Sequence, residues 1–168
     1  MTLSNIVKLK PIFRILLVLV LAYSCGTDFI VTSKKNIAKN TWLYKDTLKY
    51  HFDIEDTTKL YNLYFDVNHD INYPNQNIYV KVTTIFPNGK SISQPVSLEL
   101  ADDTGKWLGK CGNVSCEAEI LLQSKAFFDT KGQYMLMVEQ FMRQDSLKGI
   151  SSITFKIEET DEVRPVSK

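Results

Sequence analysis

Apolar and polar residues alternate along most of the chain from Trp42 onwards, and this period of two constrains the fold more than any other feature. The alternation runs through Leu63–Val67, Ile78–Val82, Val96–Leu100 and Ile153–Ile157. Successive side chains of a strand point to opposite faces, so each of these segments would bury one face and expose the other. That pattern is typical of antiparallel sheets, whereas no stretch combines helical periodicity with helix caps.

Turn-forming clusters separate the alternating segments, at Asn72–Asn75, Pro87–Gly89 and Asp102–Gly105. We expect two further strands, Ile120–Phe128 and Tyr134–Phe141, and the second should be central because it is apolar on both faces. Roughly seven to nine strands at this spacing predict an all-β fold, a single antiparallel β-sandwich domain over residues 41–158.

Composition excludes several classes of protein. The 168 residues include 20 Lys and Arg and 19 Asp and Glu, a net charge of +1, and binding nucleic acid needs a clear basic excess. Hydrophobic residues make up 44% of the chain, enough for a core, which excludes wholesale disorder. With only two His, few catalytic or metal-site arrangements are open to this chain.

Residues 1–24 read as a signal peptide. Lys8, Lys10 and Arg14 precede an apolar run over Ile15–Tyr23, which is much shorter than the roughly 20 residues of a spanning helix. The sequence Ala22-Tyr23-Ser24-Cys25 that follows resembles a bacterial lipobox, which predicts lipidation of Cys25. Ordinary cleavage after Ser24 is the alternative and would leave Cys25 as a plain thiol.

The segments on either side of the sandwich look polar and unpatterned. We interpret residues 25–40 as a lipidated tether, able to hold the domain up to roughly 50 Å from a membrane, and residues 159–168 as a flexible tail. Without the signal peptide the chain keeps 17 of its 20 basic residues (20 − 3) and all 19 acidic residues, a net charge of −2.

Side chains that could support chemistry are sparse. If Cys25 is lipidated, Cys111 and Cys116 remain as an even pair, and a disulfide would close a small loop between them. A metal site or free thiols are the alternatives, although His51 and His69 lie far upstream of the pair.

His69 and the Asp102–Gly105 segment are better explained by structural roles than by a catalytic or metal site. We expect His69 to be a surface or turn histidine, and Asp102–Gly105 to be a hairpin turn with Gly105 at positive φ rather than a calcium site. No catalytic, cofactor-binding or metal site is predicted.

The densest stretch of the chain is Gly105-Lys106-Trp107-Leu108-Gly109. It predicts a tight turn followed by a short strand. Trp107 either fills the core or stays exposed as the anchor of a partner, because tryptophan is enriched in binding hot spots. The pattern alone favours the core.

An ordered set of motifs resembles the gliding motility lipoprotein GldH family of Bacteroidetes. The set comprises Leu100-Ala101-Asp102, the Gly105–Gly109 stretch, Gly132-x-Tyr134, Glu139-Gln140-x-Met142-Arg143 and Leu147-x-Gly149-Ile150. Tyr73-Pro74 with Asn77-Ile78-Tyr79 lies upstream of it. Together with the lipoprotein signal, the resemblance covers about residues 42–158.

The resemblance implies a non-catalytic component of the gliding motility apparatus, linked to type IX secretion and without a cofactor. Its expected partners are the membrane, through the lipid anchor, and other gliding or secretion envelope proteins, with neither nucleic acid nor a small-molecule substrate. The expected partner contacts are Gly105, Lys106, Trp107, Leu108, Gly109, Gln140, Met142 and Arg143.

The same resemblance suggests a place in the cell. No acidic run follows Cys25, which favours an outer-membrane position facing the periplasm. A carbohydrate-binding lipoprotein of a glycan-uptake system is the alternative function, because exposed tryptophans and tyrosines on β-sandwiches can stack on sugars.

Overall fold

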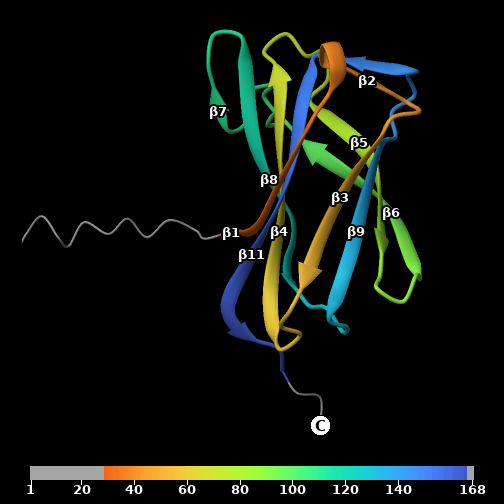
Figure 1. Ribbon diagram of the computed structural model, residues 1–168. Coiled ribbons are helices and arrows are strands. Elements are labelled where there is room, and N and C mark those ends of the chain that lie inside the picture. Colours follow the sequence, from red (N-terminus) through yellow and green to blue (C-terminus); the bar gives the residue numbers. More distant parts are fainter. Residues whose placement is uncertain (1–28, 166–168) are drawn as a thin grey trace, which may run out of the picture.

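The computed structural model describes residues 29–165, which form two antiparallel sheets facing each other (Figure 1). The larger sheet has five strands in the order β1-β11-β4-β8-β7, and the smaller has four in the order β3-β9-β5-β6. Strands β10 and β2 pair with each other at one end of the molecule. The predicted all-β, antiparallel β-sandwich fold is confirmed.

Most of the predicted strands are present. The strands are β1 (Phe29–Asn36), β2 (Thr41–Leu43), β3 (Thr47–Ile54), β4 (Lys59–Asp70), β5 (Asn77–Ile85), β6 (Ser91–Glu99), β7 (Lys110–Cys111), β8 (Ser115–Ala126), β9 (Gly132–Gln140), β10 (Ser146–Lys148) and β11 (Ile150–Val163). A short 3-10 helix, η1 (Ala38–Asn40), joins β1 to β2. Strand β9 lies between β3 and β5, as its two apolar faces predict.

Alternate residues of the facing strands form the core. Phe65 and Val67 of β4 are 0% exposed, as are Ile78 and Val80 of β5. The residues between them point to the outer faces of the sheets, which is the arrangement that the period of two requires.

Strand β11 is buried on both faces from Ser152 to Ile157. It lies inside its sheet, between β1 and β4. Lys156 lies on its outer face and is almost buried there. Its Nζ lies 2.9 Å from Asp66 Oδ1, also contacts Glu119 Oε2, and is 4.2 Å from the centroid of the Phe29 ring. Burial lowers the pKa of Lys156, but the hydrogen bonds to Glu119 and Asp66 outweigh it and hold the pKa above its usual value.

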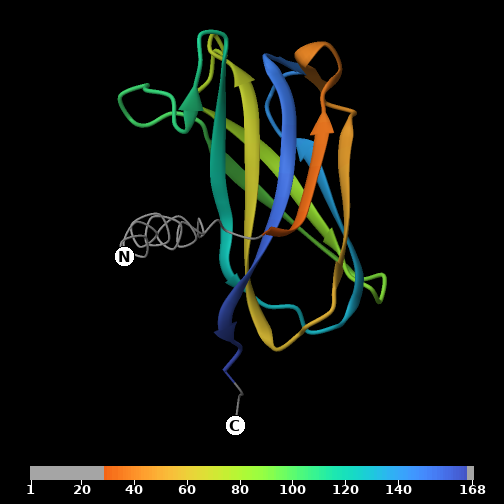
Figure 2. The ribbon, with the colours of Figure 1, turned by 60° about the vertical axis from the view of Figure 1, so that its left-hand side comes forward.

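The predicted tether over residues 25–40 is wrong from Phe29 onwards. Residues 29–36 form β1, an edge strand that pairs with β11 from Phe29↔Glu158 to Asn36↔Ser152, and it lies between β11 and β3 (Figure 2). Val31 packs against the core and Ile37 is only 8% exposed. An edge strand needs few inward-facing apolar residues, so its polar sequence looks like a linker.

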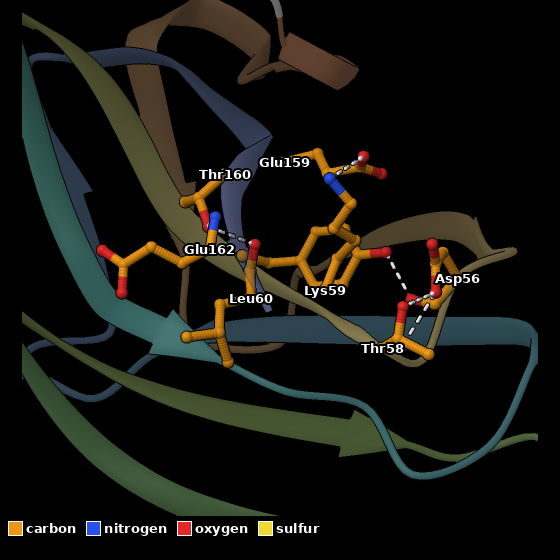
Figure 3. Close-up of polar contacts among 8 residues, drawn as sticks. Asp56, Thr58, Lys59, Leu60, Glu159, Thr160 and Glu162 are labelled. Atoms are coloured by element: carbon orange, nitrogen blue, oxygen red, sulfur yellow. Dashed lines mark hydrogen bonds and ion pairs between the residues drawn. The ribbon is translucent and has the colours of Figure 1, made fainter. Parts of the chain in front are cut away.

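The predicted flexible tail over 159–168 is wrong for residues 159–163. Strand β11 continues to Val163, which pairs with Lys59 of β4. Figure 3 shows the contacts that hold this end: Lys59 Nζ lies 3.8 Å from Glu159 Oε1, and Thr160 Oγ1 donates to the Leu60 carbonyl at 2.9 Å. In the turn that leads into β4, Thr58 donates to the carboxylate of Asp56 through both its N–H and its hydroxyl.

The predicted signal peptide over 1–24 and the lipidation site Cys25 lie outside the described residues. Within residues 29–165, no helix has the length and apolar character needed to cross a bilayer.

The placement of β1 predicts a stability difference between the isoleucines at its two ends, Ile30 near the start and Ile37 directly after Asn36. Ile37→Ala should lower the free energy of unfolding by about 2–4 kcal/mol, because Ile37 is buried in the core cluster. Ile30→Ala should change it by less than about 0.5 kcal/mol, because Ile30 is 50% exposed. Urea unfolding of the two variants measures both. If both substitutions changed the free energy of unfolding equally and only slightly, residues 29–40 would be a tether and not part of the sandwich.

Candidate functional site

The Gly105–Gly109 stretch forms a hook between β6 and β7. Asp102 Oδ1 accepts hydrogen bonds from the backbone N–H of Thr104 at 2.9 Å and of Lys106 at 3.0 Å, and from the Thr104 hydroxyl at 2.7 Å. These bonds lower the pKa of Asp102. Gly105 has φ +82, as predicted for this turn.

Trp107 packs against the core at the base of the hook. Its Nε1 donates to the Ile71 carbonyl at 3.1 Å, and its ring centroid lies 4.6 Å from that of His69. The side chain is half-buried and borders the hydrophobic core cluster. The core position favoured by the sequence therefore describes Trp107 better than a free anchor does.

His69 is fully buried at 0% exposure, so the expected surface or turn histidine is wrong. It occupies an inward-facing position of β4, two residues beyond the buried Val67. Its Nδ1 lies 2.9 Å from the Asp70 carbonyl, which can only accept, so the proton is on Nδ1. Burial lowers the pKa of His69, which keeps the ring neutral at pH 7.

The hook returns to the sheet at Gly109, whose φ is +83. A Cβ at this position would collide with the carbonyl oxygen of Glu117 on β8, so only glycine allows the close approach. Directly after it, Cys111 and Cys116 are joined by a disulfide across the β7–β8 pair. The disulfide expected from the sequence is thus present.

Gln140 and Met142 hold the loop that follows β9. Gln140 is 1% exposed; its Nε2 donates to the Gln144 carbonyl at 2.8 Å and its Oε1 accepts from the Met142 N–H at 2.9 Å. Met142 Sδ accepts from the Tyr79 N–H at 3.3 Å. Both side chains are therefore part of the structure of the loop, whereas Arg143 at its tip is exposed.

The two motif groups do not form one continuous face. The hook and the 141–145 loop lie at the same end of the sandwich (Figure 1), but within sheet β3-β9-β5-β6 the strand β5 separates β9 from β6. Of the eight residues expected to contact a partner, the non-glycine residues exposed to solvent are Lys106, Leu108 and Arg143.

Sequence reasoning missed an exposed aromatic patch beside Arg143. Tyr44 is 54% exposed, Tyr79 48% and Phe141 51%, and the Phe141 N–H donates to the Tyr79 carbonyl at 2.7 Å. Tyr44, Phe141 and Arg143 line a shallow hollow there. We refer to Tyr44, Tyr79, Phe141 and Arg143 as the aromatic patch. No sequence signal identifies it, since Tyr44 and Phe141 meet only through the pairing of β2 with β10.

The two tryptophans are not free to stack on a sugar. Trp42 is 0% exposed, and its Nε1 donates to the Asp46 carbonyl at 2.9 Å; Trp107 is held as described above. In the part of the chain that the structure describes, no group of three or more His, Cys, Asp or Glu side chains could hold a metal ion.

Comparisons with known proteins connect this chain to one family. A sequence model of the family described as GldH lipoprotein matches residues 29–157. A gliding motility lipoprotein GldH homolog of Christiangramia forsetii is 28% identical over 159 residues, covering 89% of this chain and 96% of that protein. The gliding motility lipoprotein GldH of Flavobacterium johnsoniae is 24% identical over 161 residues, covering 92% and 99%.

Among solved structures, one similar chain is a carbohydrate-binding module specific for non-crystalline cellulose. It is 11% identical, with a TM-score of 0.38, and the match covers 79% of this chain and 72% of the module. A likeness at this level has no bearing on function.

The contacts of Trp107 predict that its loss destabilises the fold. Trp107→Ala should lower the free energy of unfolding by about 2–4 kcal/mol, because it removes the packing on His69 and the hydrogen bond to Ile71. Leu108→Ala, one residue along the hook and 40% exposed, should cost less than about 0.5 kcal/mol. Urea unfolding measures both. A Trp107→Ala variant as stable as the wild type would contradict the packing role and favour a partner anchor.

Proposed function

Because this chain belongs to the GldH lipoprotein family, we propose that it is a non-catalytic, membrane-anchored interaction component of the gliding motility apparatus, linked to type IX secretion. The observation that carries the proposal is the architecture of one end of the sandwich. Several motif residues (Trp107, Gly109, Gln140, Met142) are used to build two loops there, and these loops present Lys106, Leu108 and Arg143 to solvent. Loops fixed in this way on a rigid sheet are typical binding elements.

The aromatic patch is the part of this end best suited to bind a protein. Tyrosine and arginine are enriched in binding hot spots, where they combine a large apolar surface with hydrogen-bonding groups. Here Tyr44, Phe141 and Arg143 are exposed around a shallow hollow, and the exposed Tyr79 lies on the strand beside Phe141. The proposed partner is another envelope protein of the gliding or secretion machinery.

The proposed anchor is a lipid on Cys25, in the outer membrane and facing the periplasm. The lipobox-like sequence before Cys25, the lipoprotein description of the family and the absence of an acidic run after Cys25 support this position.

Lipidation predicts a change in distribution for Cys25→Ser. The wild-type protein should pellet with membranes, and Cys25→Ser should appear as an uncleaved precursor or in the soluble fraction. Mass spectrometry of the wild-type N-terminus is the direct measurement. An unmodified Cys25 at the mature N-terminus would sink the anchor proposal.

The docking role predicts a loss of binding when the aromatic patch is truncated. Phe141→Ala together with Arg143→Ala should reduce capture of a motility or secretion component from envelope extracts at least tenfold, since losing a hot-spot residue costs about 2 kcal/mol or more. The thermal midpoint should stay close to that of the wild type, because both side chains are exposed.

The matched control is Phe127→Ala. Phe127 is as exposed as Phe141, at 51% each, but it lies at the other end of the sandwich, where Arg164 stacks on its ring at 4.0 Å. The control should keep full capture. Equal capture by all variants would refute docking at the patch. Saturable glycan binding lost on Phe141→Ala would instead favour the carbohydrate-binding alternative.

A further inference from the structure

The two sheets separate from each other along one side of the sandwich, between the edge strands β6 and β8. The inward-facing residues of β6 show this, because their exposure rises along the strand. Leu98 is 0% exposed, Val96 is half-buried and Ile92 is 60% exposed, although all three lie on the face that points to the other sheet. In Figure 2 the tip of the β5–β6 hairpin lies well away from β8. The core is therefore open to solvent on this side.

A cavity of about 300 Å³ occupies this opening. Its wall comes from both sheets and is mostly apolar, and it includes Phe52 of β3, Leu63 of β4 and Leu122 of β8. Leu63 is only half-buried, whereas Tyr61 and Phe65, in the same inward-facing row, are almost completely buried. This volume is at the lower end of the range for small-molecule sites, and apolar cavities stay dry and take up apolar ligands. The fold thus leaves room for an apolar ligand here.

The strands beside the cavity are poorly suited to pair with a further strand. Pro95 lies in β6 and has no N–H to donate. On the other side, the pairing of β8 with β4 shifts register between Leu121 and Gln123, and Lys125 has φ +52. Bulges and prolines of this kind protect edge strands from pairing. An occupant that needs no backbone hydrogen bonds fits better, which favours a lipid chain over an extended peptide.

The volume and the polar residues of the wall indicate which lipid fits. A methylene group fills about the volume of a water molecule, roughly 30 Å³, so the cavity has room for about ten methylenes of one acyl chain. Thr84, Gln94 and Gln123 add uncharged hydrogen-bonding groups to the wall. Its one charged residue within residues 29–165 is Asp129, and Arg164 pairs with it at 2.6 Å. Hydroxyl and amide groups suit the ester and hydroxyl groups of a monoacyl glycerolipid, whereas Asp129 disfavours the carboxylate of a free fatty acid.

The cavity lies at the end of the sandwich where β1 begins. One row of paired residues crosses the large sheet to the cavity: Val31, Ile157, Leu63 and Gln123. The row spans three strand spacings, about 14 Å. Only residues 26–28 separate Cys25 from Phe29, the first residue of β1. This step rests on the lipid anchor proposed above: a lipid on Cys25 would hold this end of the sandwich near the bilayer, where lipids are at hand.

We infer that the cavity between β6 and β8 binds the acyl chain of a monoacyl glycerolipid from the membrane that holds the anchor. The chain lies between the sheets against Leu63 and Leu122, and the ester lies beside Gln94 and Gln123. Binding buries apolar side chains that are half-buried in the free protein, and this burial drives it. The site is separate from the aromatic patch, because Phe127, at the opposite end of the sandwich from the patch, is part of its wall.

A photoreactive lipid tests this assignment on the mature, lipidated protein in phosphatidylcholine vesicles. The probe is lysophosphatidylcholine with a diazirine in its acyl chain. Illumination should label the cavity wall, above all the peptides that contain Val96 of β6 and Leu122 of β8, and mass spectrometry identifies the labelled peptides. Unlabelled lysophosphatidylcholine should compete with the probe, and the labelling should saturate.

The blocking variant is Thr84→Phe. Thr84 is half-buried on the inward face of β5 and lines the cavity. A phenyl ring there displaces several methylenes, each worth about fourfold in the binding equilibrium, so labelling at low probe concentration should fall at least tenfold. Gln94→Phe, at an exposed position of the wall on β6, should lower it too and does not disturb the core.

The matched control is Thr83→Phe, one residue away on the outer face of the same strand, where Thr83 pairs with Ser93. It should leave the labelling unchanged. Urea unfolding of all three variants checks that each is folded.

Several outcomes would overturn the inference. They are equal labelling of the Thr84→Phe and Thr83→Phe variants, label confined to residues 25–28, and a dimer of the wild-type protein that only the cavity variants lose, which would assign the cavity to a second copy of the chain. If the protein does not stay on vesicles, the anchor is refuted, and the same probe in solution decides whether the cavity binds the lipid. Absent labelling with full capture of a motility component would overturn this inference alone, whereas normal labelling without capture would overturn only the proposed function.

Discussion

The rings of Phe52 and Phe155 meet between the two sheets at a centroid distance of 5.4 Å, and the rest of the structure depends on this contact. Tyr134 stacks on Phe52 at 5.5 Å, and Tyr50 packs on Phe155 at 5.7 Å. The Tyr50 hydroxyl also donates to the Ile153 carbonyl at 3.0 Å, and burial raises the pKa of Tyr50 far above its ordinary value, so this donor is never lost. The cluster fixes β3 and β9 on β11, and thereby the loops that follow these strands.

How much of the fold can be predicted from the sequence depends on how each strand is buried. The strands with one buried face, such as β4 and β5, follow from alternation alone. Strand β1 could not be recognised, because its pairing with β11 is made by backbone groups and Val31 is its main contact with the core. The last part of β11 does not show in the sequence pattern for a related reason: it pairs with β4 although its side chains are polar.

The candidate site was predictable only in part. The motifs single out residues around the hook and at the end of β9, but a motif cannot tell whether these residues face a partner or build the loops. Gln140 is the clearest case: a polar side chain in a motif suggests recognition, yet its amide is fully used by Gln144 and Met142. His69 differs from the expectation because a lone histidine usually prefers water, whereas here its ring packs beside Trp107. The aromatic patch arises from segments distant in sequence, which no local pattern reveals.

The buried motif residues and the short segment between Cys25 and β1 together restrict how a partner can reach this protein. Strand β1 occupies much of what looked like a long tether, so a lipid on Cys25 would keep the sandwich beside the bilayer instead of up to roughly 50 Å above it. Strand β1 runs from Phe29 towards η1 and β2, and the patch residue Tyr44 directly follows β2. The aromatic patch therefore lies beyond the end of β1 that is farther from Cys25 along the chain. A partner that binds the patch would therefore have to reach an end of the sandwich that lies about one strand length, roughly 26 Å, from the start of β1.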